Sequence, residues 1–137
     1  MCWGSDSDSQ RGDDSSFGGN VYAPVNVAGL EPGSGAGVQA IALGSNHTCA
    51  LVHGGVKCWG KNDRGQVGIG VVSTKPLPVD VWGLTPGTGA GVQAISLRDD
   101  VSCALVNGAI KCWGSNDNGQ LGDGTSGTNR LTPVSIY

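Results

Sequence analysis

One tripeptide, Cys-Trp-Gly, occurs three times in the chain, at residues 2–4, 58–60 and 112–114. Successive copies begin 56 and 54 residues apart. The stretch 32–41 also matches 86–95 at every position but one, where Ser34 corresponds to Thr88. A recurrence of this length and regularity restricts the chain to an architecture built from copies of one supersecondary unit.

The repeated unit has the pattern of short strands joined by tight turns. Glycine accounts for 25 of the 137 residues, and the glycines stand between short alternating apolar runs. No 3.6-residue periodicity competes over a useful length. Four strands in a unit of this length predict an all-β fold made of propeller blades, each with four antiparallel strands. In the last copy we expect these strands near Val92–Leu97, Ser102–Val106, Ile110–Gly114 and Pro133–Ile136.

Two expectations concern the core. The run Val92–Leu97 carries apolar residues on both faces, which is typical of a strand buried between neighbouring sheets. Trp59 and Trp113 recur at the same place in two copies. A recurring large aromatic usually fills core, so we expect both indoles to be buried under the Gly-Gln-x-Gly turn of the repeat.

The best-defined hairpin spans residues 102–114. Asn107-Gly108 is a two-residue turn of the kind that tolerates positive φ at both positions. Pairing about it places Cys103 opposite Cys112, and a His53-Gly54 turn in the preceding copy places Cys49 opposite Cys58. Both cysteine pairs fall at non-hydrogen-bonded sites, where side chains approach most closely, so they could support cross-strand disulfides. We expect these disulfides in an oxidising medium, with Cys2 left as a free thiol.

The segments 103–108 and 111–124, with the matching blocks 47–51 and 62–68, resemble the regulator of chromosome condensation repeat. The resemblance implies a seven-bladed β-propeller with about 50 residues per blade. Its version with paired cysteines resembles bacterial members, some of them secreted. The chain is too short for seven blades and corresponds to about two and a half. We expect a degenerate half-blade over 1–30, a first full blade over 31–84 and a second over 85–137.

The N-terminal copy has drifted from the other two. Ser9 stands where the others have Gly65 and Gly119, and Arg11 stands where the others have an apolar residue. We therefore expect weaker order over residues 5–20 than in either full blade. The aspartates of this segment do not follow the spacing of a calcium loop, and the Arg11-Gly12-Asp13 tripeptide is explained by drift.

Composition and charge argue against several classes of function. The formal net charge of −3 offers no basic face for nucleic acid. No apolar run approaches the length of a membrane span, so no membrane partner is expected. The first residues do not form a signal peptide. The location of the protein stays open, although paired cysteines would suit an extracellular or periplasmic setting.

Catalytic and cofactor chemistry find little support. His47 and Cys49 lie two residues apart on one expected strand, but the other copy has Val101 at the histidine position and no third orienting group is evident. Zinc needs more convergent ligands than these. The glycine-rich loops 33–37 and 87–91 lack the sequence context of a phosphate or dinucleotide site. We predict that the chain is not an enzyme and has no cofactor.

Loops that differ between copies are the candidates for recognition, because loops on a rigid scaffold usually carry binding. Neutral drift in exposed loops is the alternative. The leading hypothesis is a non-enzymatic protein-interaction module. One alternative is a self-assembling propeller fragment without an evolved partner, and another is a propeller that binds a small ligand or sugar. The candidate contact residues are Asn46, His47, Trp82, Arg98, Asp99, Asp100, Asn129 and Arg130.

Self-association is the second partner prediction. A blade buries both faces against its neighbours, so two and a half blades leave an apolar face at each end. We expect several copies to close into a ring by head-to-tail contacts, giving a homo-oligomer.

Overall fold

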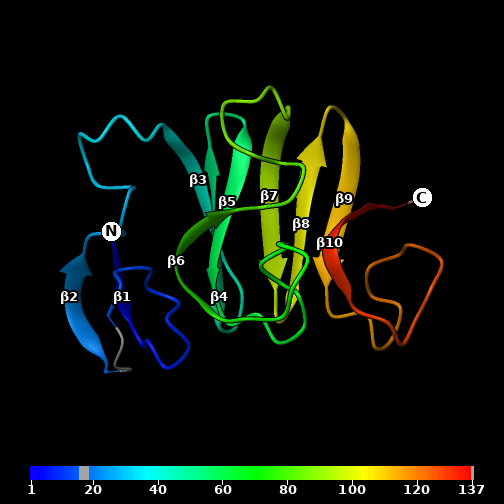
Figure 1. Ribbon diagram of the computed structural model, residues 1–137, viewed down its shortest axis with the longest axis horizontal. Helices are drawn as coiled ribbons and strands as arrows, with labels where there is room; N and C mark the ends of the chain where they lie inside the picture. The colour runs from blue at the N-terminus through cyan, green and yellow to red at the C-terminus, as the bar shows by residue number, and fades with distance from the viewer. Residues whose placement is uncertain (16–18, 137) are drawn as a thin grey trace.

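The computed structural model describes residues 1–15 and 19–136 and contains ten strands in three antiparallel sheets. The sheets follow one another along the long axis of the molecule, and the two termini lie at opposite ends (Figure 1). The described ranges contain no helix. The first sheet has two strands, β1 (Cys2–Gly4) and β2 (Val21–Val25).

The second and third sheets each contain four antiparallel strands paired in chain order, which confirms the prediction of all-β, four-stranded blades. The second sheet comprises β3 (Val38–Leu43), β4 (His47–Val52), β5 (Gly55–Gly60) and β6 (Lys75–Asp80). The third comprises β7 (Val92–Arg98), β8 (Val101–Val106), β9 (Ala109–Gly114) and β10 (Arg130–Ser135). The last strand begins earlier than predicted, because Arg130 already pairs with Gly114 before an irregularity in the register.

The register of both hairpins agrees with the prediction. His53 and Asn107 adopt φ of 46° and 50°, followed in each turn by a glycine with positive φ. Cys103 pairs with Cys112, and Cys49 pairs with Cys58. The paired Cα atoms are 4.1 Å apart in each case, and both pairs form disulfides. A local turn of two residues therefore positions both cross-links.

The prediction that Val92–Leu97 is buried on both faces is wrong. In β7 only Val92 is buried, and the corresponding strand β3 has no buried residue. Each is an edge strand of its sheet. Among the residues that the structure describes, no sheet follows the third one, so the outer face of β7 stays open to solvent.

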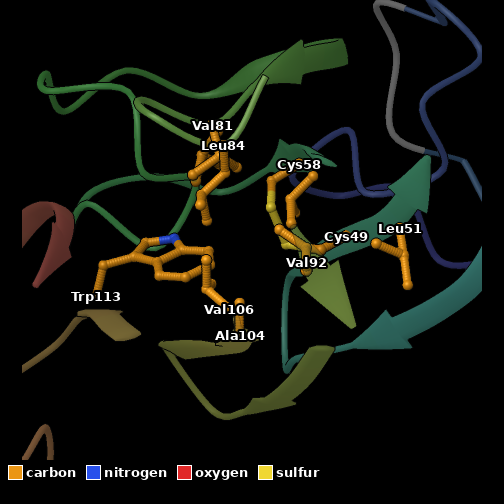
Figure 2. Packing of buried hydrophobic residues seen from close by; sticks show 11 residues of the cluster. Cys49, Leu51, Cys58, Val81, Leu84, Val92, Ala104, Val106 and Trp113 are labelled. Carbon is orange, nitrogen blue, oxygen red and sulfur yellow. A yellow bond between two sulfur atoms is a disulfide. The ribbon is translucent and has the colours of Figure 1, made fainter. Parts of the chain in front are cut away.

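The main core lies between the second and third sheets. Trp113, Val81 and Leu84 pack on one side of it, and the Cys49–Cys58 disulfide lies on the other (Figure 2). A smaller core joins the first and second sheets around Trp59. The sheets therefore hold together through side chains packed between successive repeats.

The same contact stands at the centre of each junction between repeats. The indole Nε1 of Trp113 donates to the carbonyl of Gln66, and that of Trp59 donates to the carbonyl of Gln10, both at 2.9 Å. Next to each indole a hydroxyl, from Ser102 or from Thr48, donates to the same carbonyl. The indoles are buried under the predicted turn, and in each case the turn belongs to the preceding repeat.

The described part of the drifted segment, residues 5–15, keeps this turn. Ser9 adopts φ of 59°, the left-handed conformation that Gly65 has in the next copy. Arg11 is only 4% exposed and forms an ion pair of 3.2 Å with buried Asp6. A buried ion pair thus replaces the apolar anchor of the other copies. Residues 16–18 lie outside the described residues, and weaker order over 5–20 stays a prediction.

Candidate functional site

The antiparallel topology gathers one set of loops at a single end of the molecule, the lower end in Figure 1. These loops follow the first and third strands of each complete sheet, together with the β1–β2 connection. We call this surface the loop face. It consists of residues 5–15, 44–46, 61–74, 98–100 and 115–130.

Most of the charge of the chain lies on the loop face. Nine of the eleven acidic residues and five of the eight basic residues fall within it, a balance of four negative charges. The remaining described surface carries Glu31 and Asp80 against three lysines. The net negative charge of the protein is therefore a property of this one end.

Hydrogen bonds between repeats brace the loops against one another. The Asn46 amide donates to Asp8 in the preceding repeat at 2.8 Å. The amide N–H of Ser45 donates to the carbonyl of Asp99 in the following repeat at 3.1 Å. Loops from all three sheets are thus tied into one surface.

A second set of polar contacts links the 61–74 loop to the third sheet. The side-chain amide of Gln66 donates to Asp100 at 3.0 Å and to Asp63. Arg64 forms an ion pair with Asp117 at 3.0 Å. A hydrogen bond with Asp63 raises the pKa of Lys61 above its ordinary value. Because these charges are partly exposed, the bonds position the loops more than they stabilise the fold.

The candidate residues on the loop face differ in their exposure. The side chains of Arg98 and Asp99 are 92% and 78% exposed, and Asp99 stands at a positive φ of 50°. Asn46 and Asp100 are partly buried by the braces just described. Arg98 and Asp99 are therefore the most available of the predicted contact residues.

Asn129 and Arg130 belong to the last loop and are partly buried. The Asn129 side chain accepts a hydrogen bond from the backbone N–H of Asn116. Arg130 forms an ion pair of 2.6 Å with Asp123. Hydrogen bonds from Thr125 and Arg130 lower the pKa of Asp123 to about 2. Asn129 and Arg130 therefore fix the conformation of this loop through contacts inside it, and their side chains are not freely exposed.

Two candidates do not belong to the loop face. His47 is 1% exposed, so its prediction as a contact residue is wrong: it is the first residue of β4, and its Nε2 lies 2.8 Å from Ser102 Oγ across the junction. Burial lowers the pKa of His47 to about 4. Trp82 is 69% exposed but follows the edge strand β6, outside the loop face.

Two charged residues of the loop face, Arg64 and Asp117, were absent from the sequence prediction, whereas Val71 and Val72 lie in a segment that differs between the copies. Arg64 and Asp117 are exposed, and Val71 and Val72 add apolar surface with exposed fractions of 51% and 57%. Arg64 corresponds to Asn118 in the next copy, so the criterion of difference between copies could have found it. Asp117 corresponds to Asp63 in the preceding copy, so the same criterion could not have found Asp117.

The structure assigns the paired cysteines to cross-links. Cys49 is bonded to Cys58 and is fully buried, so its sulfur is not a thiolate nucleophile beside His47. Cys2 is a free, half-buried thiol. Within residues 1–15 and 19–136, no group of three or more histidine, cysteine or acidic side chains could hold a metal ion. No helix in those ranges is long and apolar enough to cross a membrane.

Family models of the regulator of chromosome condensation (RCC1) repeat match residues 38–66 and 107–136. The human E3 ubiquitin-protein ligase HERC2 is 35% identical over 104 residues, which cover 75% of this chain and 2% of the ligase. The ultraviolet-B receptor UVR8 of Arabidopsis thaliana is 30% identical over 102 residues, covering 72% of this chain and 22% of the receptor.

The fold matches a solved structure along nearly its whole length. Prp20p from Saccharomyces cerevisiae, a protein studied for its binding to Gsp1p and histones, superimposes with a TM-score of 0.81 at 23% identity. The match covers 98% of this chain and 33% of Prp20p. The chain thus spans a third or less of each of these three relatives, and its sheets are consecutive blades of a β-propeller.

Proposed function

Since the chain belongs to the regulator of chromosome condensation (RCC1) repeat family, we propose that it is a non-enzymatic protein-interaction module that binds a protein partner through the loop face. Prp20p binds other proteins, Gsp1p and histones. The proposal takes from this relative only the mode of action, the binding of proteins by a propeller. The partner of this chain is defined instead by the chemistry of its own loop face.

The observation that carries the proposal is the combination of exposed charge and apolar surface on a braced set of loops. Asp99, Asp117 and Arg98 are exposed there, and the same face carries the exposed apolar pair Val71 and Val72. Protein interfaces combine an apolar centre with a polar rim. Loops that are already fixed lose little conformational entropy on binding.

Electrostatics define the kind of partner. The loop face carries four net negative charges, so it attracts a protein surface of net positive charge and disfavours an acidic one. Such attraction raises the association rate and weakens as ionic strength increases. We therefore expect the partner to present a basic surface with an apolar contact at its centre.

The non-enzymatic part of the proposal rests on the state of the reactive groups. Cys49 is held in a disulfide, and the nearby His47 is buried and bonded to Ser102. Neither group faces a substrate on the loop face. The exposed side chains there are carboxylates and guanidinium groups joined in ion pairs, which suit recognition.

Site-directed photo-cross-linking tests the proposal. A photo-reactive amino acid is placed at Arg98 on the loop face, or at exposed Thr88 in the 81–91 connection as the matched control. Each protein is irradiated in an extract of cells that produce it. We expect a discrete cross-linked protein from position 98 that is absent from position 88 and decreases as salt is raised. Equal labelling from both positions would contradict the proposal.

A variant of the surface provides a second readout. We expect Val71→Ser/Val72→Ser/Asp99→Asn to lose the cross-link from position 98. The matched control, Glu31→Gln/Asp80→Asn, removes two charges outside the loop face and should keep it. Retention of the cross-link in the loop-face variant would show that binding occurs elsewhere.

Self-association is a second candidate function, and the two ends of the chain favour it. Trp3 is 64% exposed, and no turn among the described residues covers its indole. At the other end, a Cβ built on Gly122 meets no atom within 4 Å, whereas one on Gly12 or Gly68 would meet the indole of the next repeat at 2.6 Å. Each end thus carries half of the contact that joins repeats inside the chain, as a ring-forming homo-oligomer requires.

A further inference from the structure

The hydrogen bonds of His47 fix the position of its proton. The ring is buried at the junction between the second and third sheets, and its Nε2 lies 2.8 Å from Ser102 Oγ. The Ser102 hydroxyl in turn donates to the carbonyl of Gln66 at 2.8 Å. A hydroxyl has a single hydrogen to donate, so Ser102 must accept from His47. The ring therefore carries its proton on Nε2 and leaves Nδ1 bare.

The bare nitrogen has nothing to receive a second proton. Nδ1 is buried and has no hydrogen-bond partner among the residues that the structure describes. The carbonyl of Asp99 lies close by, against Gly44, but it accepts from the backbone N–H of Ser45 and makes no hydrogen bond with Nδ1. Protonation would thus create a buried charge and a buried N–H without an acceptor, which is costly.

The charged groups around His47 do not offset this cost. Within residues 1–15 and 19–136, none of them forms an ion pair or a hydrogen bond with the ring. Burial alone lowers the pKa of His47. The titratable groups on the elements packed around the ring are the amino group of Met1, Cys2, Asp8, Arg11, Lys61, Asp63, Asp99 and Asp100.

The ring lies next to a brace of the loop face, the hydrogen bond of 3.1 Å from the N–H of Ser45 to the carbonyl of Asp99. A Cβ built on Gly44 would collide with the His47 ring and would also lie 2.7 Å from that carbonyl oxygen. The ring, the backbone of Gly44 and the carbonyl of Asp99 are therefore in close packing. A ring that moves outward to reach water must separate the 44–46 loop from the 98–100 loop.

We propose that protonation of His47 opens this brace, so that the loop face is ordered at neutral pH and loosened in mild acid. Loss of the bond to Ser102 also disturbs Gln66, whose side-chain amide donates to Asp100 on the loop face. Asp99, among the most exposed of the candidate contact residues, is part of the brace itself. Weaker partner binding in acid is the one consequence that rests on the proposed function.

The size of the effect follows from proton linkage. A solvated imidazole titrates near about 6.5, whereas burial lowers the pKa of His47 in the closed structure to about 4. Between these values the open form takes up a proton that the closed form does not. Opening should therefore become up to about 25-fold more favourable as the pH falls from about 7.5 to about 5.

Hydrogen exchange of the Ser45 amide, followed by NMR on the chain alone, tests the proposal. Rates are corrected for the intrinsic effect of pH and expressed as protection factors. We expect protection of Ser45 to fall up to about 25-fold between pH 7.5 and pH 5. Exchange should not depend on low concentrations of urea, because local opening exposes little surface. The amide of Asn107, bonded to the carbonyl of Gly91 at the opposite end of the molecule, is the internal control and should not change.

His47→Val is the matched control, since Val101 stands at this position in the next copy. His47→Gln is a second control that keeps a donor for Ser102 without a titrating group. In both variants we expect the protection of Ser45 to be independent of pH. Constant protection in the original chain, an equal fall in the variants, or exchange of Ser45 only through global unfolding in urea would overturn the proposal. None of these results would affect cross-linking from position 98 at neutral pH, so the two proposals fail separately.

Discussion

The indole of Trp113 donates its hydrogen bond to the backbone carbonyl of Gln66, 47 residues earlier in the chain and in the preceding repeat. The carbonyl lies within a Gln-x-Gly turn whose glycine, Gly68, leaves no room for a side chain beside the same indole, because an added Cβ would meet it at 2.6 Å. One repeat thus covers the tryptophan of the next, and the contact recurs between Gln10 and Trp59. Because the stability of a repeat protein depends on such neighbour contacts, the residues of this junction should dominate its energetics.

Gly68→Ala should destabilise the fold more than Gly122→Ala. Both glycines have positive φ, 79° and 72°, so alanine adds backbone strain at each. Only at Gly68 does the new Cβ also meet an indole, at 2.6 Å from Trp113 Nε1. We expect a loss of about 1 kcal/mol from strain at Gly122 and about 2–4 kcal/mol at Gly68. Urea denaturation of the two variants measures the difference, and equal midpoints would contradict the role of the contact.

The buried pair of Asp6 and Arg11 predicts strongly non-additive mutations. Arg11→Leu alone leaves the Asp6 carboxylate buried without its cation and should cost about 3–5 kcal/mol. Asp6→Asn/Arg11→Leu restores the asparagine and the leucine found at Asn116 and Leu121 in the last copy. We expect the double variant to be as stable as the original chain or more so. Denaturation of the two single variants and the double variant completes the cycle. A double variant as unstable as Arg11→Leu would contradict this account.

His47 predicts a loss of stability in mild acid. Burial lowers the pKa of His47 in the folded protein to about 4, below its ordinary value of about 6.5. Between these values the unfolded chain takes up a proton that the folded chain does not. The contribution of His47 is therefore complete above pH 6.5 and is lost as the pH falls towards 4, by up to roughly 3 kcal/mol.

His47→Val is the matched control for this pH dependence, because Val101 occupies the same position in the next copy. The carboxylates titrate in both proteins, so the difference between the two stability curves isolates the histidine. We expect the curves to diverge below pH 6.5, measured by denaturation at a series of pH values. Parallel curves would show that His47 takes up its proton in the folded state.

The two disulfides should differ in their susceptibility to reduction. Cys49 and Cys58 are fully buried between the second and third sheets. Cys103 is partly exposed, on the face of the third sheet that no other described sheet covers. We expect dithiothreitol to open Cys103–Cys112 first, with loss of each disulfide costing about 2–3 kcal/mol. Alkylation followed by peptide mapping gives the order, and reduction of Cys49–Cys58 first would reverse it.

Trp3 should control self-association. Among the described residues, no turn covers its exposed indole as turns cover Trp59 and Trp113, and no indole lies against the turn at Gly122. We expect the chain to associate at micromolar concentration, and Trp3→Ala to weaken this association. Trp82→Ala, which removes another exposed tryptophan, is the control and should have no effect. Analytical ultracentrifugation measures all three proteins, and a stable monomer of the original chain would contradict the ring-forming candidate.

Local sequence patterns were enough to predict most of the secondary structure. Residue alternation and the turns at His53-Gly54 and Asn107-Gly108 were enough to predict the hairpins, and with them the pairing of the cysteines. These features depend on residues close together in the chain, so a single strand or turn contains the information that specifies them. The repeat spacing then predicted four-stranded blades.

The tertiary structure alone decided how each position is used. The sequence predicted His47 as a contact residue, but the neighbouring sheet buries its side chain. The sequence also indicated that Arg11 had replaced an apolar anchor, but in the structure Arg11 is buried in an ion pair with Asp6. In the same way, the apolar strand β7 remained open because no described sheet covers it. The physical reason is that burial depends on packing between repeats about 50 residues apart, whereas turns and strands depend on neighbours along the chain.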